Sequence, residues 1–275
     1  MIKKMVGFAV LAVGLTLPWP VVKSQELDAC GKPMTADKLA RVTRDYQEIM
    51  NVADMHEYYH NDWAHADEIK NIWAQHRDDS VTWTNNTDKY IGMKDLSRFY
   101  VENLKHQNLV GALAYHMLTT PVIVIAGDGQ TAKGIFMSFG NVSGSMEGKT
   151  MADWTEEKYG IDFVKEDGHW KIWHLRTYVE YYFPIHGDFT VPDDNMAAPD
   201  RLKKNPMPPG APPQAAETKG SNGGATIKSE PGSNFDMAEP TVKGDYYDGY
   251  YTTRPLSFNP PIPKDYCHWD DSMSF

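Results

Sequence analysis

The stretch FVKEDGHWKIWHL, residues 163–175, decides the fold of this protein. The dipeptide Asp167-Gly168 at its centre is typical of a two-residue turn between antiparallel strands. Apolar and aromatic residues alternate with polar ones on both sides of this turn, as they do in half-buried strands. The stretch therefore predicts a long hairpin, with one strand from Trp154 to Lys165 and a return strand from His169 to Tyr182.

Other elements extend this pattern towards the N-terminus. A second hairpin is expected from His116 to Phe139, followed by a linker that contains Gly140, Gly144 and Gly148. Further upstream, helical spacing of apolar residues predicts helix over 35–76, beginning at Thr35, and again over 94–105. A short strand at 80–84 and the pair Tyr90-Ile91 lie between them. Helices followed by a hairpin-linked antiparallel sheet indicate an α+β fold in which helices cover one sheet face.

The charge of the chain restricts its partners. Its 275 residues include 27 basic and 37 acidic side chains, for a formal net charge of −10. Because nucleic-acid binders carry basic patches over the phosphates, we expect no nucleic-acid partner. After residue 23, no uncharged apolar run is long enough to span a bilayer, so we also expect no stable membrane insertion.

The first 24 residues predict a signal peptide. Lys3 and Lys4 precede a short apolar run, which ends at two prolines before a plausible cleavage site at Val22-Lys23-Ser24. We therefore expect an exported protein, periplasmic or secreted. Removal of three lysines with the leader would change the net charge to 24 − 37 = −13.

The chain has two cysteines, Cys30 and Cys267. An even count in an exported protein favours a disulfide, which would join the mature N-terminus to the C-terminal tail. Two separate thiols, or a link between subunits, are the alternatives.

Composition divides the mature chain into three parts. We expect one α+β domain over 25–190, a flexible linker rich in proline and glycine over 191–245, and an aromatic tail over 246–275. Fourteen of the 18 prolines lie between Pro184 and Pro263, which supports the linker. A tail with so many aromatic residues should dock on its own sheet or on a neighbouring subunit, although a disordered end is the alternative.

Three strings occur in the order and spacing of a known family. They are YIGMKDLSRFY (90–100), YHMLTTPVIVIAGDGQTAKG (115–134) and FVKEDGHWKIWHL (163–175). Together they make residues 40–182 resemble the SnoaL-like group of the nuclear transport factor 2-like superfamily, which includes scytalone dehydratase and the bile-acid 7α-dehydratase. The resemblance implies a cone-shaped, curved antiparallel sheet that encloses a pocket with the N-terminal helices. It also implies a homodimer or homotrimer.

The resemblance further implies a catalytic pair. His116 would act as general base and acid, and Asp62 would orient its imidazole, as a carboxylate does in such pairs. Asn61 stands where the family commonly has a tyrosine, so it would contact a substrate oxygen, and Tyr58 or Tyr59 would supply the hydroxyl. The alternatives are that His116 and the two tyrosines only pack in the core.

Aromatic side chains on the expected strands would line the pocket and favour an aromatic or polycyclic substrate. Arg176 is a candidate for binding a substrate carboxylate. The expected substrate-binding residues are Asn61, Trp83, Phe136, Tyr159, Trp173 and Arg176.

A competing motif lies at residues 56–60, HEYYH, which matches the H-E-x-x-H zinc signature. His56 and His60 would be the ligands. However, no third ligand follows in register, and no strand pattern precedes the helix as it does in zinc proteases, so no metal is expected.

The sequence thus favours a cofactor-independent lyase that acts on an aromatic or polycyclic small molecule. The leaving group would be water or formaldehyde, or the reaction would be an isomerisation. The alternatives are a non-catalytic small-molecule binding module and a zinc hydrolase.

Overall fold

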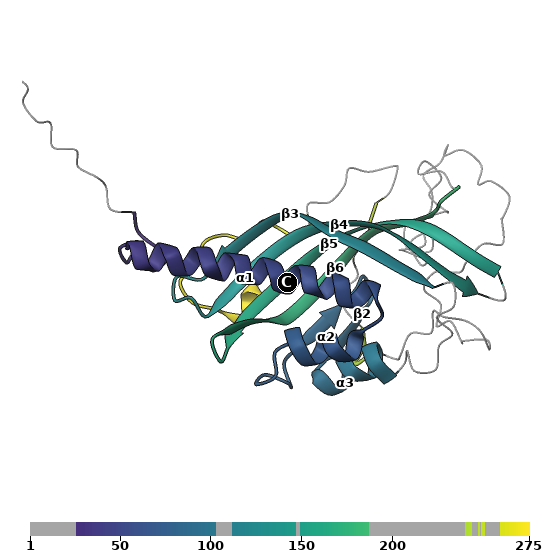
Figure 1. The fold of residues 1–275 in the computed structure, drawn as a ribbon, viewed down its shortest axis with the longest axis horizontal. Helices are drawn as coiled ribbons and strands as arrows, with labels where there is room; N and C mark the ends of the chain where they lie inside the picture. The colour runs from purple at the N-terminus through teal and green to yellow at the C-terminus, as the bar shows by residue number, and fades with distance from the viewer. Residues whose placement is uncertain are drawn as a thin grey trace, which may run out of the picture.

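The computed structural model describes residues 26–102, 112–146, 149–186, 240–243, 247, 249–250 and 259–275. The expected signal peptide lies outside the described residues, as do most of the expected linker and part of the tail. Figure 1 shows an open, curved sheet with the long helix α1 lying along one face. The α+β class expected from the sequence is therefore confirmed.

Among the described residues, seven strands form the sheet, in the order β3-β4-β5-β6-β1-β2-β7. All neighbouring pairs are antiparallel except β1 and β6, which run parallel. The sheet is therefore antiparallel, as expected, apart from this one pair. The strands are β1 (Thr82–Thr84), β2 (Asp88–Ile91), β3 (Leu113–Ile125), β4 (Thr131–Met146), β5 (Lys149–Glu166), β6 (His169–Pro184) and β7 (Val242–Lys243).

The hairpin from β5 to β6 turns at Asp167 and Gly168, as predicted. Both residues have positive φ, 50° and 83°, which is the backbone that a tight hairpin turn requires. By contrast, the linker expected after Phe139 is wrong, because β4 continues to Met146. Gly140 lies opposite His116 in the sheet, and a Cβ at this position would be 1.9 Å from the carbonyl oxygen of Tyr115. This glycine permits a close approach of two strands and does not mark a loop.

The helices pack on one face of the sheet. They are α1 (Ala36–Asn61), α2 (His65–Ile72) and α3 (Met93–Ser97), and α3 continues into a π-helix, η1 (Arg98–Glu102). The Thr35 hydroxyl accepts a hydrogen bond from the Lys38 N–H at 3.2 Å, so α1 begins where the sequence predicts. The helical run expected over 35–76 is interrupted at 62–64, where Trp63 takes a positive φ of 57°.

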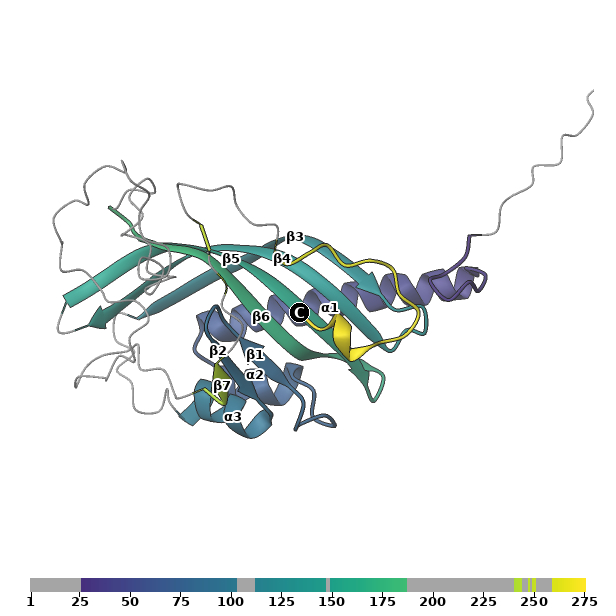
Figure 2. The same ribbon diagram turned by 180° about the vertical axis from the view of Figure 1, so that it is seen from behind.

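The C-terminal residues lie on the opposite face of the sheet from α1 (Figure 2). A disulfide joins Cys30 to Cys267. Beyond it, the ring of Phe275 packs on Gly160, where a Cβ would lie 2.6 Å from the ring. The fully buried carboxylate of Asp162 pairs with Lys133 and accepts a hydrogen bond from the Phe275 N–H. The last part of the tail, residues 259–275, therefore docks on the sheet of its own chain.

Within the described part of the chain, no helix has both the length and the apolar character needed to cross a membrane.

Candidate active site

The buried face of α1 changes from apolar to polar along its length. Ile49, Val52 and Ala53 are buried against the sheet, and the same helical spacing continues with His56, Glu57 and His60. Because a helix returns to one side every three or four residues, these polar groups follow the apolar ones into the interior. The last turns of α1 thus place two imidazoles and a carboxyl group between helix and sheet.

A second carboxyl group, Glu68 on α2, is the centre of a hydrogen-bond network. It is fully buried and bonds to Nδ1 of His56 at 2.8 Å, to Nδ1 of His65 at 2.7 Å and to the indole N–H of Trp73 at 2.9 Å. Burial alone would raise the pKa of Glu68, but the two imidazoles outweigh it and hold that pKa well below its usual range. Burial alone would likewise lower the pKa of His56, whereas the carboxylate of Glu68 raises it. Glu68 is therefore an ionised anchor.

The sheet contributes the opposite wall. The rings of His60 and His116 have centroids 5.5 Å apart, and those of His56 and Tyr159 are 5.8 Å apart. We call this group the inner cluster. Its members are His56, Glu57, His60, His65, Glu68, Tyr100, His116, Glu157 and Tyr159.

Several buried polar atoms in or beside the inner cluster have no hydrogen-bond partner among the described residues. They are both carboxyl oxygens of Glu57, Nδ1 of His60, Nδ1 of His116 and the hydroxyl oxygen of Ser138. Leaving such a group unsatisfied costs about 1–3 kcal/mol, so native structures rarely do so without a reason. A concentration of these atoms beside one another indicates a site that receives hydrogen bonds from a ligand.

The surroundings of these groups set their protonation. Burial raises the pKa of Glu57, and the positive charges of His56 and His116 oppose this effect only in part. Burial lowers the pKa of His60 well below its usual value, with further lowering from His65, so His60 is a neutral imidazole. Burial also raises the pKa of Tyr159 well above its usual value. The cluster therefore places two neutral groups, His60 and Tyr159, near the ionised Glu68.

The expected pairing of His116 with Asp62 is not present. His116 is buried, whereas Asp62 is exposed beyond the end of α1, and no hydrogen bond joins the two. Instead, Asn61 holds the backbone of His116: its Oδ1 accepts from the His116 N–H at 2.9 Å, and its Nδ2 donates to the His116 carbonyl at 3.3 Å. The interruption of the helix after Asn61 explains the difference, because it brings Asn61 to β3 and leaves Asp62 in solvent.

The two tyrosines proposed as hydroxyl donors are also remote. Tyr58 is 74% exposed on the outer side of α1. The hydroxyl of Tyr59 accepts a hydrogen bond from Asn71 at 2.9 Å, outside the inner cluster. The helical register explains both positions, because residues 56, 57 and 60 occupy the buried face.

The expected substrate-binding residues divide into two groups. Phe136 and Tyr159 lie opposite each other on β4 and β5, are buried, and face the helices. Trp83 packs on Phe99 and Tyr90, and its ring contacts Tyr100 of the inner cluster.

The other two lie on the side of the sheet that carries the tail. Trp173 packs with His174 and Trp269, and the guanidinium of Arg176 lies over the ring of Tyr178. Strand alternation places Arg176 on the same side as His174. Trp173 is the extra residue at the register irregularity between Ile172 and His174, and its indole N–H donates to Ser80, so the expectation that these two residues face the site is corrected.

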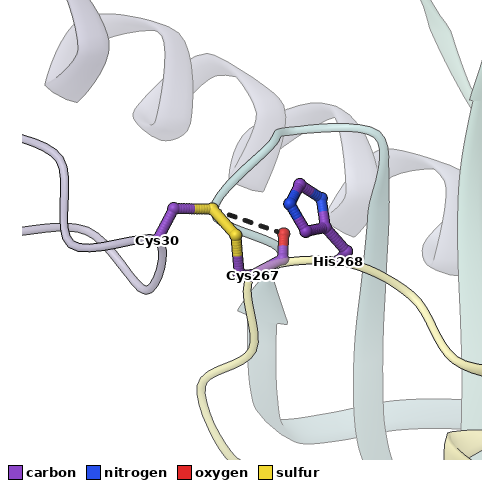
Figure 3. A group of neighbouring side chains, drawn as sticks. All are labelled: Cys30, Cys267 and His268. Atoms are coloured by element: carbon purple, nitrogen blue, oxygen red, sulfur yellow. Dashed lines mark hydrogen bonds between the residues drawn. A yellow bond between two sulfur atoms is a disulfide. The ribbon is translucent and has the colours of Figure 1, made fainter.

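The zinc motif does not gain a third ligand. Nδ1 of His56 is already bonded to Glu68. Within the described ranges, the one group of three potential ligand atoms within 4.8 Å of one another comprises Cys30, Cys267 and His268. Figure 3 shows that the two sulfur atoms of this group are bonded to each other, so they are not available as thiolate ligands.

Sequence reasoning missed the central role of Glu57, His65 and Glu68. A signal for Glu57 was present, because the spacing of Ile49, Val52 and Ala53 continues to residues 56, 57 and 60. Glu68 carries no comparable signal, since an acidic residue near the start of a helix is ordinarily solvated.

Comparison with known proteins gives a family for most of this domain. Residues 41–176 match the family model described as the SnoaL-like domain. No curated protein matches the chain in sequence.

Solved structures with similar folds share little sequence with the chain. A hexachlorocyclohexane dehydrochlorinase from Novosphingobium barchaimii LL02 is 19% identical, covers 56% of this chain and 98% of its own, and has a TM-score of 0.42. A putative scytalone dehydratase from Novosphingobium aromaticivorans is 11% identical, with 56% and 94% covered and a TM-score of 0.43. A nuclear transport factor 2-like superfamily protein from Salmonella enterica serovar Typhimurium is 15% identical, with 50% and 91% covered and a TM-score of 0.42. The family model thus identifies residues 41–176 as a SnoaL-like domain.

Proposed function

We propose that the protein is a cofactor-independent lyase or isomerase that acts on a small molecule at the inner cluster. The observation that carries the proposal is the state of His116, which is 4% exposed on β3 and has no hydrogen-bond partner for Nδ1 among the described residues. An imidazole titrates near neutral pH, so it can both accept and return a proton. His116 is therefore the proposed general base.

The role of Asn61 changes in this proposal. Its two hydrogen bonds to the backbone of His116 fix the position of that residue against the end of α1. Asn61 is thus a positioning residue, and the substrate oxygen is left to the unpartnered atoms of the inner cluster. Fixing a base relative to its substrate contributes to rate because reacting groups must lie within bonding reach.

The proposed substrate is an uncharged, hydroxylated aromatic compound. The rings of Phe136, Tyr159 and Tyr100 supply apolar surface beside the cluster, which supports an aromatic group. None of the described members of the inner cluster is a lysine or an arginine, and His56 is already paired with Glu68, so the cluster is a poor match for an anionic substrate group. The unpartnered oxygens and nitrogens favour a substrate that donates hydrogen bonds from hydroxyl groups.

Export and self-association are separate parts of the proposal. The disulfide between Cys30 and Cys267 supports an oxidising, extracytoplasmic compartment, periplasmic or secreted. A homodimer or homotrimer follows from the family resemblance and is tested by the mass of the protein in solution.

The reaction is tested by mass spectrometry of products. The purified protein, a His116→Asn variant and a His76→Asn control at an exposed histidine would each be incubated with hydroxylated diaryl and polycyclic compounds. We expect loss of water or of formaldehyde, or an isomer of unchanged mass, with the wild type and the control. His116→Asn should be slower by about 10²–10⁴-fold. Equal rates in wild type and His116→Asn would refute the proposed base, and binding without turnover would favour the non-catalytic binding module.

A further inference from the structure

We infer that Glu57 is a second catalytic residue, a neutral carboxylic acid that donates a proton to the leaving group while His116 acts as the base. This inference rests on the proposed function and adds the general acid that the expected pair of His116 and Asp62 does not provide.

The hydrogen bonding of the three glutamates in the inner cluster distinguishes Glu57 from the other two. Glu68 makes three hydrogen bonds, and Glu157 accepts two, from the hydroxyl of Tyr182 at 2.5 Å and from that of Thr155 at 3.3 Å. Glu57 is 5% exposed, and neither of its oxygens makes a hydrogen bond of regular geometry with a described residue, although the hydroxyl of Tyr159 lies near enough to lower its pKa. A buried carboxyl group in this state can make its hydrogen bonds to a substrate, whereas the other two are committed to the protein.

The neighbours of Glu57 come from three elements. His56 lies on the same helix, His116 faces it from β3, and Glu157 and Tyr159 face it from β5. Burial is the largest effect and raises the pKa of Glu57, and the negative charge of Glu157 raises it further. The charged forms of His56 and His116, together with the hydroxyl of Tyr159, lower the pKa in part, and the net shift remains upward, which is the direction that a general acid requires.

One acid and one base complete an elimination of water. His116 takes the proton from carbon, the electron pair of that C–H bond forms the double bond, and the C–O bond breaks. The departing hydroxyl takes the proton of Glu57 and leaves as water. Transfer of the proton from His116 to Glu57 then restores both groups.

The same pair also suits release of formaldehyde. His116 takes the proton of a hydroxymethyl O–H group, a C=O bond forms as the C–C bond breaks, and Glu57 protonates the carbon that receives the electron pair. The remaining proton returns from His116 to Glu57. Neither reaction requires an oxidant, a reductant or a co-reactant.

The protonation of Glu57 is tested without a substrate. Infrared difference spectra at neutral pH would compare the wild type with Glu57→Gln and with Asp54→Asn, a control on the exposed side of the same helix. We expect a protonated-carboxyl band in the wild type and in the control that is missing in Glu57→Gln. Identical spectra for wild type and Glu57→Gln would show that Glu57 is ionised and would overturn the inference.

The role as an acid is tested by changing the leaving group. A diaryl ethanol requires a proton on its departing oxygen, whereas the matching diaryl ethyl chloride loses chloride without one. We expect Glu57→Gln to slow loss of water by about 10²–10⁴-fold and to slow loss of chloride by less than about tenfold. The wild-type rate of water loss should fall as the pH rises through the pKa of Glu57, and this decline should be absent in Glu57→Gln.

The outcomes separate the inference from the proposed function. If His116→Asn abolishes both reactions while Glu57→Gln matches the wild type or slows both equally, the general acid is wrong and the lyase stands. If His116→Asn leaves both reactions at the wild-type rate, the proposed function itself fails.

Discussion

Glu68 offers a sharp test of how the inner cluster is held together. Replacing it with alanine would remove three hydrogen bonds, those to His56, His65 and Trp73, and would leave these partners buried and unsatisfied. Breaking a buried ion pair by removing one partner costs about 3–5 kcal/mol. Because 1 kcal/mol shifts the Tm of a domain of this size by about 2–4 °C, Glu68→Ala should lower Tm by about 6–20 °C.

Glu68→Gln tests the contribution of the charge alone. Oε1 accepts from both His56 and Trp73, so a glutamine whose oxygen takes this place keeps two bonds and loses the one to His65. Loss of one hydrogen bond to a charged group costs about 1.5–3 kcal/mol. The expected order of stability is wild type, then Glu68→Gln, then Glu68→Ala.

The pH dependence of stability follows from the two opposite pKa shifts. The pKa of Glu68 is lowered in the folded state. Its contribution to folding stability is therefore present above the pKa of the unfolded state, about 4.3, and is lost as the pH falls through the lowered pKa of the folded state. The pKa of His56 is raised, so its contribution is complete below the unfolded value of about 6.5 and is lost as the pH rises through the raised value. The difference in free energy of unfolding between wild type and Glu68→Gln should therefore decrease above about pH 6.5, by at most about 1.4 kcal/mol per pH unit.

Urea unfolding followed by tryptophan fluorescence, at a series of pH values, measures the free energy of unfolding of the wild type, Glu68→Ala and Glu68→Gln. Asp67→Asn, at an exposed position of α2, is the matched control and should unfold like the wild type. A Glu68→Ala protein within 1 kcal/mol of the wild type, or a gap to Glu68→Gln that stays constant with pH, would refute the network as an energetic anchor.

Two further predictions concern the sheet wall of the site. Gly140→Ala would place a Cβ 1.9 Å from the carbonyl oxygen of Tyr115, so the strand that carries His116 must shift. Overpacking of this kind lowers the free energy of unfolding by about 1–3 kcal/mol. A Tm equal to that of the wild type would contradict the close approach of the two strands. Ser138→Ala should have the opposite sign, because its fully buried hydroxyl has no partner among the described residues and removing it relieves a desolvation cost of about 1–3 kcal/mol. Calorimetry of both variants checks these signs, and a Ser138→Ala protein that is less stable than the wild type would show that the hydroxyl is hydrogen-bonded.

The strands could be predicted because their pattern is local. Alternation on both sides of Asp167-Gly168 indicates the last hairpin, and the positive φ values at these two residues confirm the turn. The same local reasoning failed at Gly140, because a glycine that permits a close approach of strands looks the same in sequence as one in a loop.

The site was harder to predict than the fold. His116 and Phe136 were expected on strands, and the structure has both on strands and buried. Asp62 was expected beside His116, but the chain turns one residue earlier, and Asn61 takes the contact through its amide. A one-residue difference at a helix end exchanges a buried position for an exposed one, and no local pattern predicts such an end to the nearest residue.

The sequence by itself determined the α+β class, the turn of the long hairpin and the family to which residues 41–176 belong, because each depends on short-range spacing. Only the tertiary structure decided which acidic groups enter the interior. Glu57 and Glu68 are ordinary helical glutamates in sequence, and what separates them is the set of partners that the packing of α1, α2 and the sheet brings within hydrogen-bond reach. Burial and the distances to those partners control protonation and hydrogen bonding, and both arise from contacts between residues far apart in the chain.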